Sequence, residues 1–467
     1  MATVVVPAER QAPARNPWPG VVALAFAASI AALQNTAVVP LLPVLQRELH
    51  ASLAAVSWTL TISLLVAAVS TPLLSRFGDM YGRRPMILGA LALLVAGSVM
   101  AALATTLPWL IVARVLQGFV SALVPLSIGV VRDVLPRRQL GTGIGVLSAT
   151  MGFGSGGGMI LAGLAAGDYH LVFWITGGIT LVAGAAVALL VRDGGAPGGG
   201  RPDLLGAALL TAWLVALLLG ISQGGSWGWT SPRVLGLFAA TVVLAAAWVA
   251  VERRVAEPLV EMAMLTHRGT IGATAASALL GFAFFTSMTG ISGFAQAPAS
   301  TGYGLGASTL QVGLYLLPST LFMLVISLFS GRFMRRFAAS SLVGAGSAAV
   351  GAAGLWLVVA HGSGDMYVAA SLLGIGLGVG YAALGTMAVE HVDPGRTAVA
   401  AGVNALVRIV GGSTAGAAIA AILAAQPGVR GYQWVFATAA LAGGAAALFA
   451  FVYGRINRRA ATAPSAR

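Results

Sequence analysis

The sequence predicts an all-α integral membrane protein with fourteen transmembrane helices, in which two pseudo-symmetric six-helix bundles flank two extra helices. Composition supports this prediction, because 58% of the 467 residues are hydrophobic and only 8% are charged, whereas a soluble globular chain carries about a quarter charged residues. The same numbers exclude intrinsic disorder, since disordered chains are poor in apolar residues. The chain has no Cys, which excludes disulfides, thiolate nucleophiles and Cys-ligated metals.

The individual spans are predicted from the intervals between charged residues. A helix that crosses a bilayer needs about 20 mostly apolar residues, and charge-free intervals of about that length recur along the chain. The longest interval, 269–331, holds two spans separated by a polar, glycine-rich break near 296–308. We therefore expect helices at about 20–43, 54–77, 86–106, 108–132, 140–166, 170–191, 204–222, 233–252, 271–296, 309–331, 339–360, 366–388, 398–424 and 432–455.

The distribution of arginine predicts the orientation of the chain. All 26 basic residues are Arg, against 13 acidic residues, which gives a net charge of +13. With the N-terminus in the cytoplasm, 21 Arg fall in cytoplasmic segments and three outside, while Arg114 and Arg408 fall within spans. Because cytoplasmic loops carry an excess of basic residues, we expect a multi-pass protein of the cell inner (cytoplasmic) membrane with both termini in the cytoplasm. A nucleic-acid partner, the competing explanation of basic charge, is disfavoured because these Arg are scattered over eight short segments.

The chain divides into matching halves. We expect a cytoplasmic tail at 1–19, a six-helix bundle at 20–191, a linker with the two extra helices at 192–268, a second six-helix bundle at 269–456 and a cytoplasmic tail at 457–467. The segments 75–81 (SRFGDMY) and 331–337 (GRFMRRF) both follow the second helix of a half and resemble each other. Matching halves are typical of transporters that rock about a central site.

The loop between spans 2 and 3 carries the first specific motif. It reads Gly78-Asp79-Met80-Tyr81-Gly82-Arg83-Arg84, in which the two Gly permit a tight turn and the charged residues form a latch at the cytoplasmic surface. Plain positive-inside anchoring would explain the same residues. The loop resembles the signature G-x-L-A-D-R-x-G-R-R of the major facilitator superfamily, with Ser75 in place of the first Gly and Met80 in place of the first Arg.

Three further elements extend this resemblance over nearly the whole chain. Span 4 reads Leu110-Ile-Val-Ala-Arg114-Val-Leu-Gln117-Gly118, similar to the L-x-x-x-R-x-x-Q-G element of the family, whose Arg faces the central cavity. Span 13 contains Asn404-Ala-Leu-Val-Arg408-Ile-Val-Gly411-Gly412, similar to the N-x-x-x-R-x-x-G-G element of fourteen-span members; Arg408 alternatively extends its charge to the interface. Span 5 is rich in glycine, as in the antiporter signature, although Ser155 stands where Pro is usual. Its glycine motif comprises Gly152, Gly154, Gly156, Gly157 and Gly158, and ordinary close helix packing explains it equally well.

The chain is thus similar to the fourteen-span drug:proton antiporter branch of this superfamily. The resemblance implies a secondary active efflux transporter that exports a drug, antibiotic or similar amphipathic small molecule by alternating access, in exchange for protons. It implies no enzyme activity, no cofactor and no metal, and we expect a monomer in the lipid bilayer. The candidate substrate-binding residues are Gln34, Asn35, Trp58, Arg114, Gln117, Tyr315, Asn404 and Arg408, with Phe285 and Tyr381 as further candidates. The candidate latch comprises Asp79, Gly82, Arg83, Arg84 and Asp133, in which the resemblance implies an Asp133–Arg83 pair that stabilises the outward-open state.

Span 1 departs from the family pattern. Members commonly read L-D-x-T-x-V, whereas this chain reads Leu33-Gln34-Asn35-Thr36-Ala37-Val38. Gln34 cannot titrate and so cannot carry a proton, and no acid is predicted near the middle of a span. We therefore expect a neutral or weakly anionic substrate, and proton coupling, if present, through a peripheral acid such as Asp133.

Other functions fit the sequence less well. A membrane-embedded lipid-modifying enzyme needs grouped catalytic acids or His, and no such cluster stands out. P-loop ATP hydrolysis is excluded because the motif requires Lys. An uptake facilitator for a nutrient remains the main alternative to export, and a scaffold without transport activity conflicts with two Arg inside spans, which are costly in a bilayer.

Overall fold

The structure is a computed structural model that describes residues 16–38, 41–164, 168–191, 199, 203–256, 258–260, 262, 268–389, 392 and 397–462. Fourteen helices within these residues are long and apolar enough to cross a membrane, which confirms the predicted number of spans. Every regular element in the described residues is helical, so the predicted fold class is confirmed.

Six spans form each half of the molecule. The first half consists of α1 (Trp18–Ala37), α3 (Leu53–Tyr81), α4 (Arg83–Ala102), the unit α5 (Leu107–Gly118), η1 (Phe119–Ala122) and α6 (Leu123–Val134), α7 (Arg137–Leu164) and α8 (Tyr169–Leu190). The second half consists of α12 (Arg268–Gln296), α13 (Thr309–Arg336), α14 (Ala339–Val359), α15 (Ser363–Val389), α16 (Thr397–Ala425) and α17 (Val429–Thr462). The extra helices α9 (Leu204–Trp227) and α10 (Pro232–Glu252) stand between them in sequence, and the short elements are α2 (Leu42–Glu48) and η2 (Ala299–Thr301).

The bounds of most spans differ from the prediction by a few residues, and three differences change the course of the chain. The first ends at Ala37, and the predicted 20–43 range also takes in the start of a separate short helix, α2, at Leu42. The fourth is interrupted by the 3₁₀ turn η1. Pro125 lies just after this turn and cannot donate to the carbonyl of Ser121, so the regular α-helical ladder breaks there. The last helix continues to Thr462, which places part of the predicted tail 457–467 in a helix.

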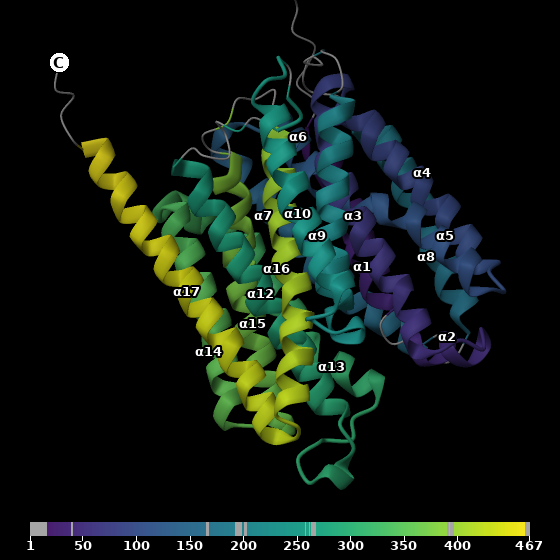
Figure 1. Cartoon of the computed structure of the whole chain (residues 1–467). Helices are drawn as coiled ribbons and strands as arrows, with labels where there is room; N and C mark the ends of the chain where they lie inside the picture. The colour runs from purple at the N-terminus through teal and green to yellow at the C-terminus, as the bar shows by residue number, and fades with distance from the viewer. Residues whose placement is uncertain are drawn as a thin grey trace, which may run out of the picture.

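The two halves lie side by side, with the N-terminal helices in purple to blue and the C-terminal helices in green to yellow (Figure 1). They meet mainly where α7 packs against α13 and where α3 and α6 pack against α16. Each half is built around a buried apolar cluster, and the cluster of the first half also takes in Ala388 and Val389 of α15 and Ala398 and Ala401 of α16. A site at the contact between the halves is therefore built on helices that are anchored in two clusters.

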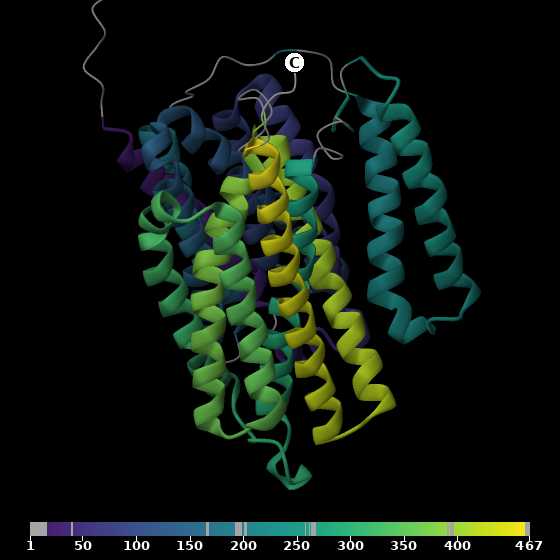
Figure 2. The ribbon, with the colours of Figure 1, turned by 90° about the vertical axis from the view of Figure 1, so that its left-hand side faces the viewer.

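The extra helices form a hairpin at one side of the bundle (Figure 2). Only α9 packs extensively on the bundle, against α3 and α16, while α10 packs mainly on α9. Leu210 and Leu214 of α9 share a buried apolar cluster with Leu65 of α3 and Val403 of α16. The hairpin thus contacts one helix of each half.

We call the end of the bundle at which α3 joins α4 the latch end. Because the number of spans is even, α1 begins and α17 ends at this same end (Figure 2).

Candidate functional site

A network of polar side chains links four helices inside the first half. Arg114 on α5 is 1% exposed, and its Nε donates to the carbonyl of Thr59 on α3 at 3.0 Å. Its Nη1 donates to Gln117 Oε1 at 2.7 Å. The same oxygen accepts from Gln34 Nε2 of α1 at 3.0 Å, and Gln117 Nε2 donates to Ser98 Oγ of α4 at 3.2 Å. Three of the predicted binding residues therefore form one unit.

The charge of this network is uncompensated. Arg114 forms no ion pair with a described residue, since the ion pairs found there join Arg83 to Asp79 and Asp133. Gln34 Oε1 is buried and accepts no hydrogen bond from a described residue. A buried cation without an anion is costly, so this region favours an incoming group that is negatively charged or rich in acceptors.

The predicted residues of span 13 lie in a second polar unit, in the other half. Asn404 is 4% exposed; its Oδ1 accepts from Ser277 Oγ at 2.9 Å and its Nδ2 donates to the carbonyl of Ala273 at 3.4 Å. These bonds join α16 to α12. The guanidinium carbon of Arg408 lies 4.8 Å from the centre of the Tyr381 ring, in a cation–π geometry, and the Arg408 side chain is half-buried.

The remaining predicted binding residues are not joined to either unit by a hydrogen bond among the described residues. Asn35 and Trp58 are half-buried. Tyr315 packs edge-on against Tyr367, with ring centres 5.2 Å apart. Phe285 is 39% exposed and covers Gly412. Their participation in a substrate site stays a prediction.

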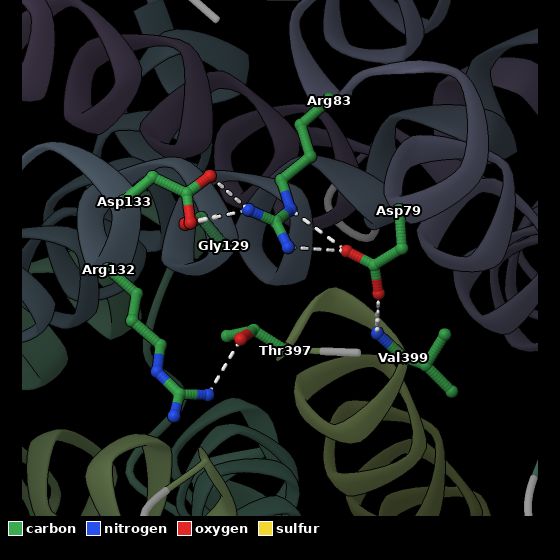
Figure 3. Close-up of polar contacts among 7 residues, drawn as sticks. All are labelled: Asp79, Arg83, Gly129, Arg132, Asp133, Thr397 and Val399. Carbon is green, nitrogen blue, oxygen red and sulfur yellow. Dashed lines mark hydrogen bonds and ion pairs between the residues drawn. The ribbon is translucent and has the colours of Figure 1, made fainter. Parts of the chain in front are cut away.

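The latch residues meet around one arginine (Figure 3). Arg83, at the start of α4, donates through Nε at 2.9 Å and through Nη2 at 2.6 Å to Asp79 Oδ1 at the end of α3. Its Nη1 pairs with Asp133 at the end of α6 and donates to the carbonyl of Gly129 at 3.2 Å. The expected pair between Asp133 and Arg83 is thus present, and Arg83 also neutralises Asp79, which is 6% exposed.

Asp79 and Arg132 extend the latch to the other half, and Figure 3 shows their bonds to Val399 and Thr397. The second carboxylate oxygen of Asp79 accepts from the backbone N–H of Val399 at 3.1 Å, in the first turn of α16. A carboxylate is favoured there, because the free N–H groups and the dipole of a helix N-terminus carry positive charge. Arg132 donates to Thr397 Oγ1 and to the carbonyl of Val392, both at 2.7 Å. Sequence reasoning did not select Arg132; its position directly before Asp133 was the available signal.

The other latch residues have separate roles in the structure. Gly82 ends α3 with a φ of 106°, a conformation that residues with a Cβ rarely adopt. Arg84 does not lie between the two acids: its Nη2 donates to the carbonyl of Ala188 on α8 at 2.6 Å. Arg83 and Arg84, which are adjacent at the turn between α3 and α4, therefore bind different partners.

The acids of the described chain all lie at helix ends, which agrees with the expectation that none stands near the middle of a span. They are Glu48, Asp79, Asp133, Asp168, Asp203, Glu252 and Asp365. The remaining acids, Glu9, Asp193, Glu257, Glu261, Glu390 and Asp393, lie outside the described residues.

The glycines of α7 face two different neighbours. Added Cβ atoms at Gly154 and Gly158 would overlap the backbone carbonyls of Ser29 and Leu33 on α1. Added Cβ atoms at Gly152 and Gly156 would lie 2.7 Å from Met323 Sδ and Thr320 Oγ1 of α13, across the contact between the halves. At Gly157 the nearest atom would be 3.7 Å away, an ordinary contact. The motif thus lets α7 pack closely on both sides.

We expect Gly154→Ala to destabilise the protein, because the added methyl group meets a backbone carbonyl that cannot rotate away. Overpacking of this kind costs about 1–3 kcal/mol. The measurement is the thermal unfolding midpoint of the purified protein, with Gly157→Ala on the same helix as the matched control. Equal midpoints for the two variants would contradict the packing role assigned to Gly154.

The known proteins that match this chain are membrane transporters. A sequence profile described as Major Facilitator Superfamily matches residues 24–416 and 280–467. The tetracenomycin C resistance and export protein of Streptomyces glaucescens is 30% identical over 421 residues, covering 88% of this chain and 77% of the relative. The multidrug transporter protein MdtP of Bacillus subtilis is 25% identical, covering 76% of this chain and 66% of the relative.

The crystal structure of the human organic anion transporter MFSD10 superposes with a TM-score of 0.68 and 15% identity, covering 94% of this chain and 100% of that chain. At this identity the likeness shows the shared fold alone.

Proposed function

Because the chain belongs to the major facilitator superfamily, we propose that it is a secondary active exporter that moves a drug, an antibiotic or a similar amphipathic small molecule out of the cell by alternating access. It is a multi-pass membrane transporter and not an enzyme. The names of two relatives, an antibiotic export protein and a multidrug transporter, support export over uptake. We place the latch end and both termini in the cytoplasm, because 21 of the 26 Arg then lie on the cytoplasmic side.

The observation that carries alternating access is the polar link between the halves at the latch end. Transporters of this architecture rock two halves about a central site. Here the Asp79–Arg83–Asp133 unit of the first half reaches α16 of the second half at the backbone of its first turn, where the N–H of Val399 bonds Asp79, with Arg132 beside it. Few bonds need to break for the halves to separate at this end. The latched conformation then closes the site toward the cytoplasm.

The Arg114 network supports a neutral or anionic substrate. Its guanidinium has no ion-pair partner among the described residues, and Gln34 adds amide groups where a titratable acid would supply negative charge. A substrate carboxylate, phenolate or carbonyl would complement this charge, while an organic cation would be repelled. Apolar helix faces around it would hold the rest of the molecule.

Proton exchange is the proposed energy source, and we propose that the protein acts as a monomer in the lipid bilayer. The test is efflux from loaded cells that express the gene, with and without a protonophore. Export should slow when the proton gradient is removed. Export at an unchanged rate after collapse of the gradient would contradict antiport but leave export intact.

We expect Gln34→Glu to reduce export of an anionic substrate by at least about tenfold. The new carboxylate would lie beside Gln117 and within reach of Arg114, whose charge it would neutralise from within the protein. A close charge pair of this kind is worth more than about 1.4 kcal/mol, or one decade, in a buried site. The measurement is initial efflux rate, with a neutral substrate of the same size as the comparison.

A parallel loss for both substrates would indicate that Gln34→Glu disturbs the fold rather than the charge preference. Gln34→Asn, which keeps an uncharged amide, serves as the second control.

A further inference from the structure

A second buried polar site lies in the extra hairpin, away from the Arg114 network. Glu252 ends α10 and is 3% exposed. One of its oxygens, Oε2, accepts from the backbone N–H of Val260 at 3.3 Å. The other, Oε1, is buried and has no hydrogen-bond donor among the described residues. Burying a carboxylate with an unbonded oxygen costs free energy, and a proton or cation bound to this oxygen would lower that cost.

The free oxygen of Glu252 faces a second acid. Asp203 caps the N-terminus of α9, where its Oδ1 accepts from the N–H of Gly206 at 2.8 Å. Its other oxygen, Oδ2, is also buried without a donor among the described residues. The two free oxygens border the same point: a Cβ added at Gly206 would overlap Asp203 Oδ2 and would lie 3.0 Å from Glu252 Oε1.

The surroundings of the pair contain no compensating charge among the described residues. No ion pair of the described chain involves either acid. Helix α9 carries no charged residue, and the segment 258–260 is Pro-Leu-Val. Arg253 and Arg254 follow Glu252 but are exposed. Trp248, one turn before Glu252, packs on Trp213 with ring centres 5.9 Å apart, and its indole N–H is the polar group that it brings to the surroundings of Glu252.

We propose that Asp203 and Glu252 form a proton-binding site, in which one proton taken from the latch-end solution is held between Asp203 Oδ2 and Glu252 Oε1. Burial of Glu252 and the nearby Asp203 carboxylate both disfavour the ionised form of Glu252, and one proton removes this penalty. Binding converts one carboxylate to a carboxyl group that donates to the other oxygen. Release breaks this O–H bond, leaves its electron pair on the carboxylate oxygen and returns the proton to the same solution.

The pair is connected to the latch helix. Val260, whose N–H bonds Glu252, belongs with Leu259 to the apolar cluster that contains Val399 and Val403 of α16. Val399 is the residue whose N–H bonds Asp79. The proton-bound pair therefore keeps the segment 258–260 and the hairpin docked on the first turns of α16, and loss of the proton loosens this docking. The inference does not depend on which substrate is exported.

The test uses the purified full-length protein in lipid nanodiscs. Infrared spectra recorded from pH 5 to 9 report protonated carboxyl groups. We expect the parent to lose a protonated carboxyl signal on alkalinisation that both Glu252→Gln and Asp203→Asn lack, by about one group per molecule. Glu48→Gln, which removes an exposed acid on α2, should match the parent. Parental spectra for both hairpin variants would overturn the proposal.

Hydrogen exchange supplies a readout for the docking. Exchange at the Val260 amide should quicken with rising pH in the parent by more than the intrinsic pH effect, and this excess should vanish in Glu252→Gln. Both substitutions suit the fold, since Gln keeps the acceptor for Val260 and Asn is a good helix N-cap. An equal excess in the parent and in Glu252→Gln would refute the link between the pair and the docking. Neither readout requires transport, so failure of the exporter assignment would be seen separately.

Discussion

Replacing Arg83 with alanine is expected to open the latch and to reduce export by at least about a hundredfold. The guanidinium neutralises Asp79 and pairs with Asp133, and removing one member of a buried charge group costs about 3–5 kcal/mol because the other members are left uncompensated. Every 1.4 kcal/mol or so changes a conformational ratio about tenfold. The conformation in which the halves are joined at the latch end should therefore become a minor one.

Opening of the latch end can be measured with labels on introduced cysteines. The chain has no Cys of its own, so there is no background labelling. Spin labels attached to Arg138→Cys on α7 and Arg335→Cys on α13 would report the distance between two exposed positions on the two halves. Arg83→Ala should lengthen or broaden this distance. Arg84→Ala, which removes the adjacent charge but leaves the two acids paired, should resemble the parent. Parental distances together with parental export in Arg83→Ala would rule out the latch.

Replacing Arg114 with alanine is expected to reduce export by at least about tenfold while the protein still reaches the membrane. The guanidinium joins Thr59 of α3 to Gln117, and through Gln117 to α1. Its loss removes the charge of this network and one of the donors to each of two acceptors, the carbonyl of Thr59 and Gln117 Oε1, which keep their bonds from Ser63 and Gln34. Arg114→Lys should restore little, because an ammonium group lacks the planar fork that reaches both acceptors.

Efflux from loaded cells, normalised to protein level, is the measurement for Arg114. Arg233→Ala, which removes an exposed arginine at the start of α10, is the control for loss of charge in general. Asn404→Ala tests the corresponding unit of the second half, where Ser277 would lose its acceptor. If Arg114→Ala and Asn404→Ala, both well expressed, export as fast as the parent, the central site assignment is wrong.

The sequence by itself determined the membrane class, the number and order of the spans and the identity of the latch acids. The spans depend on a local property, because about 20 apolar residues suffice to predict one. The latch acids were instead expected from the resemblance of the 78–84 loop to the family signature. The bounds of a span were less certain where a proline or a helix break intervened, as at Ser121–Pro125. The length of α17 was underestimated because charged residues at a helix end can remain helical in water.

Only the tertiary structure decided which polar groups meet. Gln34 and Gln117 are 83 residues apart, and Arg132 and Thr397 are 265 apart. Helices in a bilayer are apolar all round, so the sequence pattern does not fix which face turns toward which neighbour; small residues and close packing do. The rotation of each helix about its axis and its position along the bundle decide which groups meet. They place the α7 glycines against two neighbours, Asp79 at the N-terminus of α16, and Asp203 near Glu252. Because a single helix does not specify its rotation, the chemistry of the sites emerged only when the helices were assembled.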